Sequence, residues 1–153
     1  MSGSKKNMSI KSPIRQFIMA SLFFLIGGLL LGIVMLDQLS KGISTYKLIW
    51  PHVHMLLVGF MLSMIYGVGY QLIPAFLGGR LVNKSLPFIH LILHILGVII
   101  MIVGVFLARS NETEGIYYNI SSFGGLMVIS GGIIFVYSIA TIKYPESFLQ
   151  IVK

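Results

Sequence analysis

Four long apolar segments dominate the sequence and constrain its fold more than any other feature. They cover about residues 17–36, 52–77, 86–108 and 116–142, and each has roughly the 20 residues that a helix needs to cross the hydrocarbon core of a bilayer. Because 56% of the residues are hydrophobic and only 10% are charged, the chain is too apolar for a water-soluble domain. We therefore predict an all-α integral membrane four-helix bundle, a single transmembrane domain over residues 1–153.

The charged residues between these segments predict how the chain crosses the membrane. With a cytoplasmic N-terminus, eight basic residues face the inside and three face the outside, as the positive-inside rule requires. The sequence thus predicts an N-in, C-in topology in a prokaryotic cytoplasmic membrane. The net charge of +7 does not indicate nucleic acid, because the basic residues flank apolar runs instead of forming a stripe with aromatics. The inner set is Lys5, Lys6, Lys11, Arg15, Arg80, Lys84, Lys143 and Lys153, and the outer set is Lys41, Lys47 and Arg109.

The sequence lacks the residues that several classes of chemistry require. It has no cysteine, which excludes thiolate metal sites, iron–sulfur clusters and covalently attached c-type heme. It also has no glycine-rich phosphate loop and no nucleophile–base pair that would indicate hydrolysis or group transfer. The four histidines are therefore the residues to follow, because ionisable groups within membrane spans are costly and usually functional.

His52 and His54 lie at the start of the second apolar segment. Neutral imidazole is a common axial ligand of heme iron. On a helix the two side chains point about 200° apart, so they are expected to serve different metal centres. Pro51 favours the first helical turn and predicts a helix start just before the pair. The alternative is that both are solvated residues at the level of the lipid headgroups.

His90 and His94, four residues apart, share one face of the third segment. The helical rise and a core of about 30 Å predict that His94 lies roughly 15 Å deeper than His54. That separation is too large for two ligands of one iron. We expect helix–helix hydrogen bonds for this pair and favour them over a second metal or heme site.

The histidine pair opens a glycine-rich segment that ends near Tyr and Pro, and this arrangement continues into the third segment. It resembles the tenth and eleventh helices of the catalytic subunit of heme-copper oxidases and nitric-oxide reductases. Residues 122–126 resemble the twelfth helix, so the resemblance covers about residues 48–142. The matching residues are His52, His54, Gly59, Phe60, Gly67, Tyr70 and Pro74, then Arg80, Leu81, Pro87, Phe88, His90, Leu91 and Gly97.

The resemblance implies heme ligation by both outer histidines. In that family the first histidine of the pair binds the high-spin heme and the second binds the low-spin heme, near the outer surface. Carried over, these are His52 and His54, with heme b as the cofactor and electron transfer or diatomic gas binding as the function. The family's copper site takes three further histidines that have no match here, so the resemblance does not imply a full oxygen reductase.

The resemblance also implies an oligomer. The family fold has twelve helices in three four-helix arcs, and this chain resembles one arc. We therefore expect a homotrimer in which each interface receives His52 from one chain and His54 from the next.

Three further expectations follow from the sequence. Arg109, at the outer edge, is a candidate partner for a heme propionate. Met55, Met61 and Met64 accompany the histidines, and thioether with imidazole is a soft ligand set that suits Cu(I). A copper-binding membrane protein is thus one alternative function, although methionine is also a common filler of apolar packing. A cofactor-free structural subunit of a respiratory complex is the other.

Overall fold

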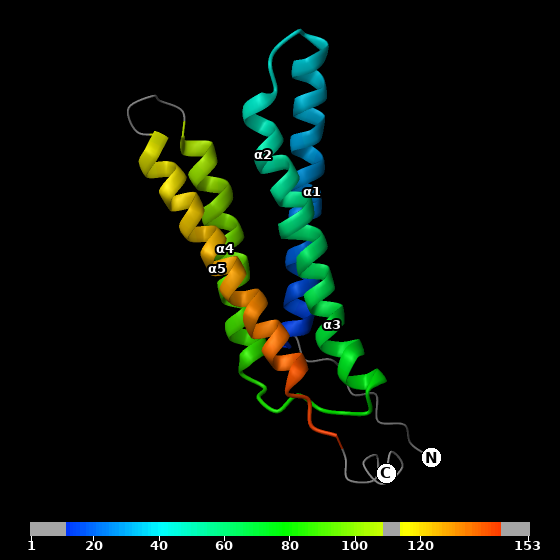
Figure 1. Ribbon diagram of the computed structural model, residues 1–153. Coiled ribbons are helices and arrows are strands. Elements are labelled where there is room, and N and C mark those ends of the chain that lie inside the picture. The colour runs from blue at the N-terminus through cyan, green and yellow to red at the C-terminus, as the bar shows by residue number, and fades with distance from the viewer. Residues whose placement is uncertain (1–11, 109–113, 145–153) are drawn as a thin grey trace.

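The computed structural model describes residues 12–108 and 114–144, which form four long antiparallel helices (Figure 1). The second of them changes its helix type along its length and consists of three consecutive elements. In chain order the elements are α1 (Pro13–Ser40), α2 (Tyr46–His54), η1 (Met55–Leu62), α3 (Ser63–Phe76), α4 (Leu86–Leu107) and α5 (Glu114–Ala140).

The protein is a multi-pass membrane protein, as the sequence predicts. In the part of the chain that the structure describes, four helical spans are long and apolar enough to cross a bilayer: Pro13–Ser40, Tyr46–Phe76, Leu86–Leu107 and Gly115–Ala140. Large apolar side chains such as Phe23 and Phe76 are exposed on the outward faces, whereas Ser21, Ser63, His90 and His94 are buried between the helices. A helical bundle whose solvent is lipid is expected to have apolar groups on its outside and polar groups between its helices.

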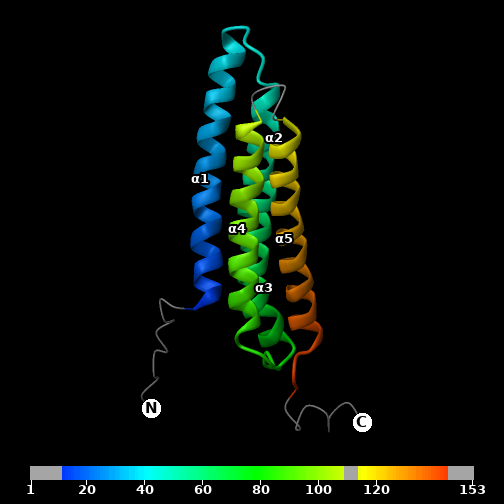
Figure 2. The ribbon, with the colours of Figure 1, turned by 90° about the vertical axis from the view of Figure 1, so that its left-hand side faces the viewer.

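The helices pack as two pairs. One pair is α1 with the α2–η1–α3 span, and the other is α4 with α5. Figure 1 shows the pairs close together at one end and diverging toward the other, and Figure 2 shows the same bundle from the side. We call the end where α1 ends and α5 begins the cavity end. We call the opposite end, where α1 begins and α5 ends, the bridge end, because a backbone bridge joins Arg80 and Lys143 there.

The second span begins earlier than the sequence predicts. Pro51 lies inside α2, which starts at Tyr46, so the predicted helix start just before the histidine pair is wrong. The segment from Tyr46 to Trp50 contains lysine and aromatic residues, and it continues the helix beyond the strongly apolar run that marks the membrane core. A proline is tolerated within such a helix because neighbouring helices compensate for the lost backbone hydrogen bond.

Directly after His54 the helix widens into the π-helix η1. A π-helix forms i→i+5 backbone hydrogen bonds, and such segments are rare and frequent at functional sites. The backbone at both ends of η1 keeps helical dihedral angles, so the span remains one continuous helix. Gly59, within η1, packs directly against the ring of Phe24 on α1.

Candidate functional site

A cavity of about 1100 Å³ lies at the cavity end of the bundle. Its walls are the end of α1, the loop that follows it and α2 on one side, and the end of α4 with the start of α5 on the other. Trp50, His54 and Lys47 of α2 face Phe106 and Tyr118 across it. The cavity lies where the two helix pairs diverge in Figure 1. The remaining lining residues are Gln38, Ile43, Ser44, Tyr46, Leu48, Ile49, Val53, Val105, Ala108, Ser121 and Ser122.

The ring of His54 is held in one orientation by Trp50. The Nδ1–H group of His54 donates a hydrogen bond to the Trp50 carbonyl oxygen at 2.8 Å, and the two rings stack at 3.7 Å with an interplanar angle of 18°. Because a carbonyl oxygen only accepts, Nδ1 must carry the proton. Nε2 of the neutral ring therefore holds a lone pair, which is the form in which histidine ligates a metal.

His52 has the same tautomer but a different direction. Its Nδ1–H group donates to the Gly28 carbonyl oxygen of α1 at 2.9 Å. A Cβ atom added at Gly32 would lie 3.0 Å from Cε1 of His52, so the imidazole packs closely on α1. His52 thus contacts α1 whereas His54 lines the cavity, as their two-residue spacing predicts. Nε2 of His52 also holds a lone pair.

Sequence reasoning missed Lys47 and Trp50 as site residues. Trp50 precedes His54 by four positions and Lys47 precedes it by seven, and both line the cavity beside it. Residues at these spacings share one face of a helix, so the signal was present once the helix was known to begin at Tyr46. Arg109 lies outside the described residues, but the preceding residue, Ala108, lines the cavity.

His94 is buried in the bundle and hydrogen-bonded to η1. Its Nε2–H group donates to the Val58 carbonyl oxygen at 3.2 Å. Val58 is only four residues from His54, so the predicted depth difference of roughly 15 Å between His54 and His94 is wrong. The error comes from the helix start: His54 is the ninth residue of α2, about 12 Å along the helix instead of the roughly 3 Å expected.

His90 joins three helices. Its Nδ1 atom shares a hydrogen bond of 3.0 Å with the Tyr70 hydroxyl of α3. A Cβ atom added at Gly131 would lie 3.3 Å from its Nε2 atom, so the ring also packs on α5. The helix–helix hydrogen bonds expected for His90 and His94 are therefore present. Among the described residues, Nε2 of His90 and Nδ1 of His94 have no hydrogen-bond partner. Both rings pack against Phe17 of α1 and Tyr66 of α3, and they lie edge to face with each other.

Replacing Tyr70 with phenylalanine is expected to lower the free energy of unfolding by about 1 kcal/mol, because His90 loses its partner in a buried site. SDS titration of the protein in mixed micelles measures this change. Tyr137→Phe is the matched control, since the Tyr137 side chain is 58% exposed and its loss of a hydroxyl should change little. Equal effects of the two substitutions would contradict a specific role for the Tyr70–His90 bond.

The three methionines of the copper hypothesis do not gather around one point. Met61 is half exposed on the outer surface of its helix. Met55 packs against Gly27 of α1, and the sulfur of Met64 lies 3.9 Å from the Ser21 hydroxyl. Packing between helices accounts for Met55 and Met64.

No protein-family model matches the sequence, and a search of curated proteins found no significant match.

Proposed function

We propose that this protein binds heme b at the cavity end of the bundle, with Nε2 of His54 as an axial ligand of the iron. The observation that carries the proposal is that His54 lies in the cavity wall with its Nδ1–H group bonded to a backbone carbonyl. Such a second hydrogen bond fixes the tautomer, orients the ring and raises the basicity of the ligating nitrogen. The protein would then serve in electron transfer or diatomic gas binding.

The lining of the cavity fits such a group. Its volume of about 1100 Å³ exceeds the roughly 300–1,000 Å³ of most small-molecule sites. Trp50, Phe106 and Tyr118 offer aromatic surface for a flat apolar ring, and Lys47 offers an ammonium group for a propionate. Arg109, immediately after Ala108, is the second candidate partner for a propionate. Bound heme supplies one-electron redox chemistry or an iron position for a diatomic gas.

We further propose that the protein is a homotrimer with one heme at each interface. His52 packs on α1 while His54 lines the cavity, so one iron does not take both residues of the same chain. A closed ring of three chains would let His52 of one protomer and His54 of its neighbour ligate the same iron. The charge distribution supports an N-in, C-in orientation, which puts the cavity near the outer surface of a prokaryotic cytoplasmic membrane.

Absorption spectra of the purified protein, oxidised and reduced, test the heme proposal. We expect a Soret band, sharp bands on reduction and, by extraction, one heme per chain, together with a trimer mass by native mass spectrometry. A colourless preparation that retains copper would support the copper-binding alternative. A colourless, metal-free protein made with ample porphyrin supply would overturn the proposal and support a structural subunit.

A further inference from the structure

A short backbone bridge joins the loop between α3 and α4 to the segment that follows α5. The Arg80 amide donates to the Lys143 carbonyl oxygen at 2.9 Å, and the Lys143 amide donates to the Arg80 carbonyl oxygen at 3.0 Å. The two residues therefore form a hydrogen-bonded antiparallel pair. In such a pair the Cα atoms are about 5.5 Å apart, and both side chains project from the same face.

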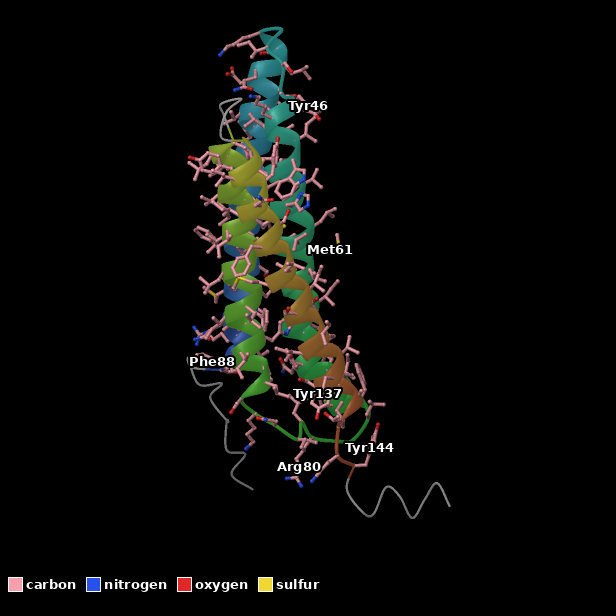
Figure 3. All side chains as sticks on the ribbon, turned by 60° about the vertical axis from the view of Figure 1, so that its left-hand side comes forward. Tyr46, Met61, Arg80, Phe88, Tyr137 and Tyr144 are labelled. Carbon is pink, nitrogen blue, oxygen red and sulfur yellow. The ribbon has the colours of Figure 1, made fainter. Side chains whose placement is uncertain are left out.

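The residues next to the bridge determine which way that face points. Leu81 packs against the core cluster around Phe17, and Ile142 is buried directly against Gly79. Because side chains alternate in extended backbone, inward-facing Leu81 and Ile142 direct Arg80 and Lys143 outward. Both are exposed. Figure 3 shows the Arg80 guanidinium directed away from the helices.

The bridge thus holds two positive charges side by side. Like charges placed directly opposite in a β pair are destabilising. In the described ranges, the acidic residues are Asp37, which pairs with Lys41, and Glu114, the first residue of α5. Both belong to the cavity end. An anion from outside this part of the chain would remove the repulsion.

We propose that Arg80 and Lys143 bind the phosphate of an anionic phospholipid at the bridge end. Guanidinium binds phosphate oxygens in a bidentate manner, and a lysine adds a second charge. Arg80 lies four residues beyond the end of α3 and Lys143 lies three residues beyond the end of α5, at the level where a headgroup follows the hydrocarbon core. Phe76, the last residue of α3, is 83% exposed and offers apolar surface for an acyl chain. Free phosphate would bind the same two basic groups but has no acyl chain to contact Phe76.

Native mass spectrometry of the full chain, released from nanodiscs of mixed phosphatidylglycerol and phosphatidylcholine, tests the site. We expect the wild type to retain phosphatidylglycerol in preference to phosphatidylcholine. Arg80→Gln and Lys143→Gln should each weaken this retention about fivefold, the effect of one basic residue near an anionic surface. The backbone bridge does not depend on either side chain, so both variants should fold. Lys41→Gln removes the same charge at the cavity end and should change nothing.

Three outcomes would overturn the proposal. The first is a lack of specificity, seen either as equal retention of both lipids by the wild type or as an equal loss of retention in Lys41→Gln. The second is displacement of phosphatidylglycerol by millimolar inorganic phosphate, which would identify a free-anion site instead. The third is a wild type that does not retain phosphatidylglycerol while Glu146→Gln does. The Glu146 carboxylate would then already neutralise Arg80 and Lys143.

Discussion

Replacing His54 with alanine is expected to abolish heme binding while leaving the helical fold intact. Loss of a residue that merely orients a metal ligand costs about 10–100-fold in metal affinity, so loss of the ligand itself should cost at least that. The side chain is half-buried at the cavity wall, and within the described residues its hydrogen bond is to Trp50 of its own helix, so little stability should be lost. Heme content per chain and thermal unfolding in detergent measure the two effects separately.

His54→Met is the informative companion to this variant. A thioether is also an axial ligand, and a Met/His pair raises the reduction potential of heme. A ligating position should therefore keep heme at a higher potential, whereas a residue that only packs against the cofactor should leave the potential unchanged. Unchanged heme content in His54→Ala would contradict the proposed site.

Coexpression of His52→Ala and His54→Ala tests the arrangement in a trimer. Each variant alone should lack heme, because every interface loses one of its two ligands. In randomly mixed trimers about one quarter of the interfaces combine an intact His52 with an intact His54. Heme content should therefore recover to about that fraction, and no recovery would rule out ligands from two chains.

The four spans could be predicted because lipid requires long apolar helices, and hydropathy reports that requirement directly. The opposed directions of His52 and His54 follow from helix geometry alone. The start of α2 could not be found in the same way. Tyr46 and Lys47 suit the headgroup region, so the helix continues where the apolar signal ends. The depth of His54 was misjudged for that reason.

The features that shape the site depend on contacts between distant residues. Val58 lies in η1, and its carbonyl accepts a hydrogen bond from His94, 36 positions later in the chain. The periodicity of apolar residues in the sequence does not predict a hydrogen bond between two residues so far apart. The cavity lies where the two helix pairs diverge, and its lining comes from α2, α4 and α5, which are far apart in the sequence. The bridge between Arg80 and Lys143 likewise joins segments whose sequences suggest only loops.

The packing of α4 on α5 depends on two glycines whose backbones touch. A Cβ atom at Gly124 would lie 2.6 Å from the Gly97 carbonyl oxygen and 2.6 Å from the Met101 amide nitrogen, and a Cβ atom at Gly97 would lie 2.7 Å from the Gly124 carbonyl oxygen. These obstacles are backbone atoms, which a change of rotamer cannot move. Close approach through small residues is a principal source of helix association in membranes.

Gly124→Ala is therefore expected to have a free energy of unfolding about 1–3 kcal/mol lower than that of Gly125→Ala, the usual cost of overpacking, and SDS titration of both variants measures it. The neighbouring Gly125→Ala is the matched control, because its Cβ would meet only the Met101 sulfur at 3.9 Å. Alanine favours helix over glycine by about 1 kcal/mol at either position, so the difference between the two variants isolates the contact with α4. Equal stability of the two variants would mean that the close contact between Gly97 and Gly124 adds nothing to the packing of α4 on α5.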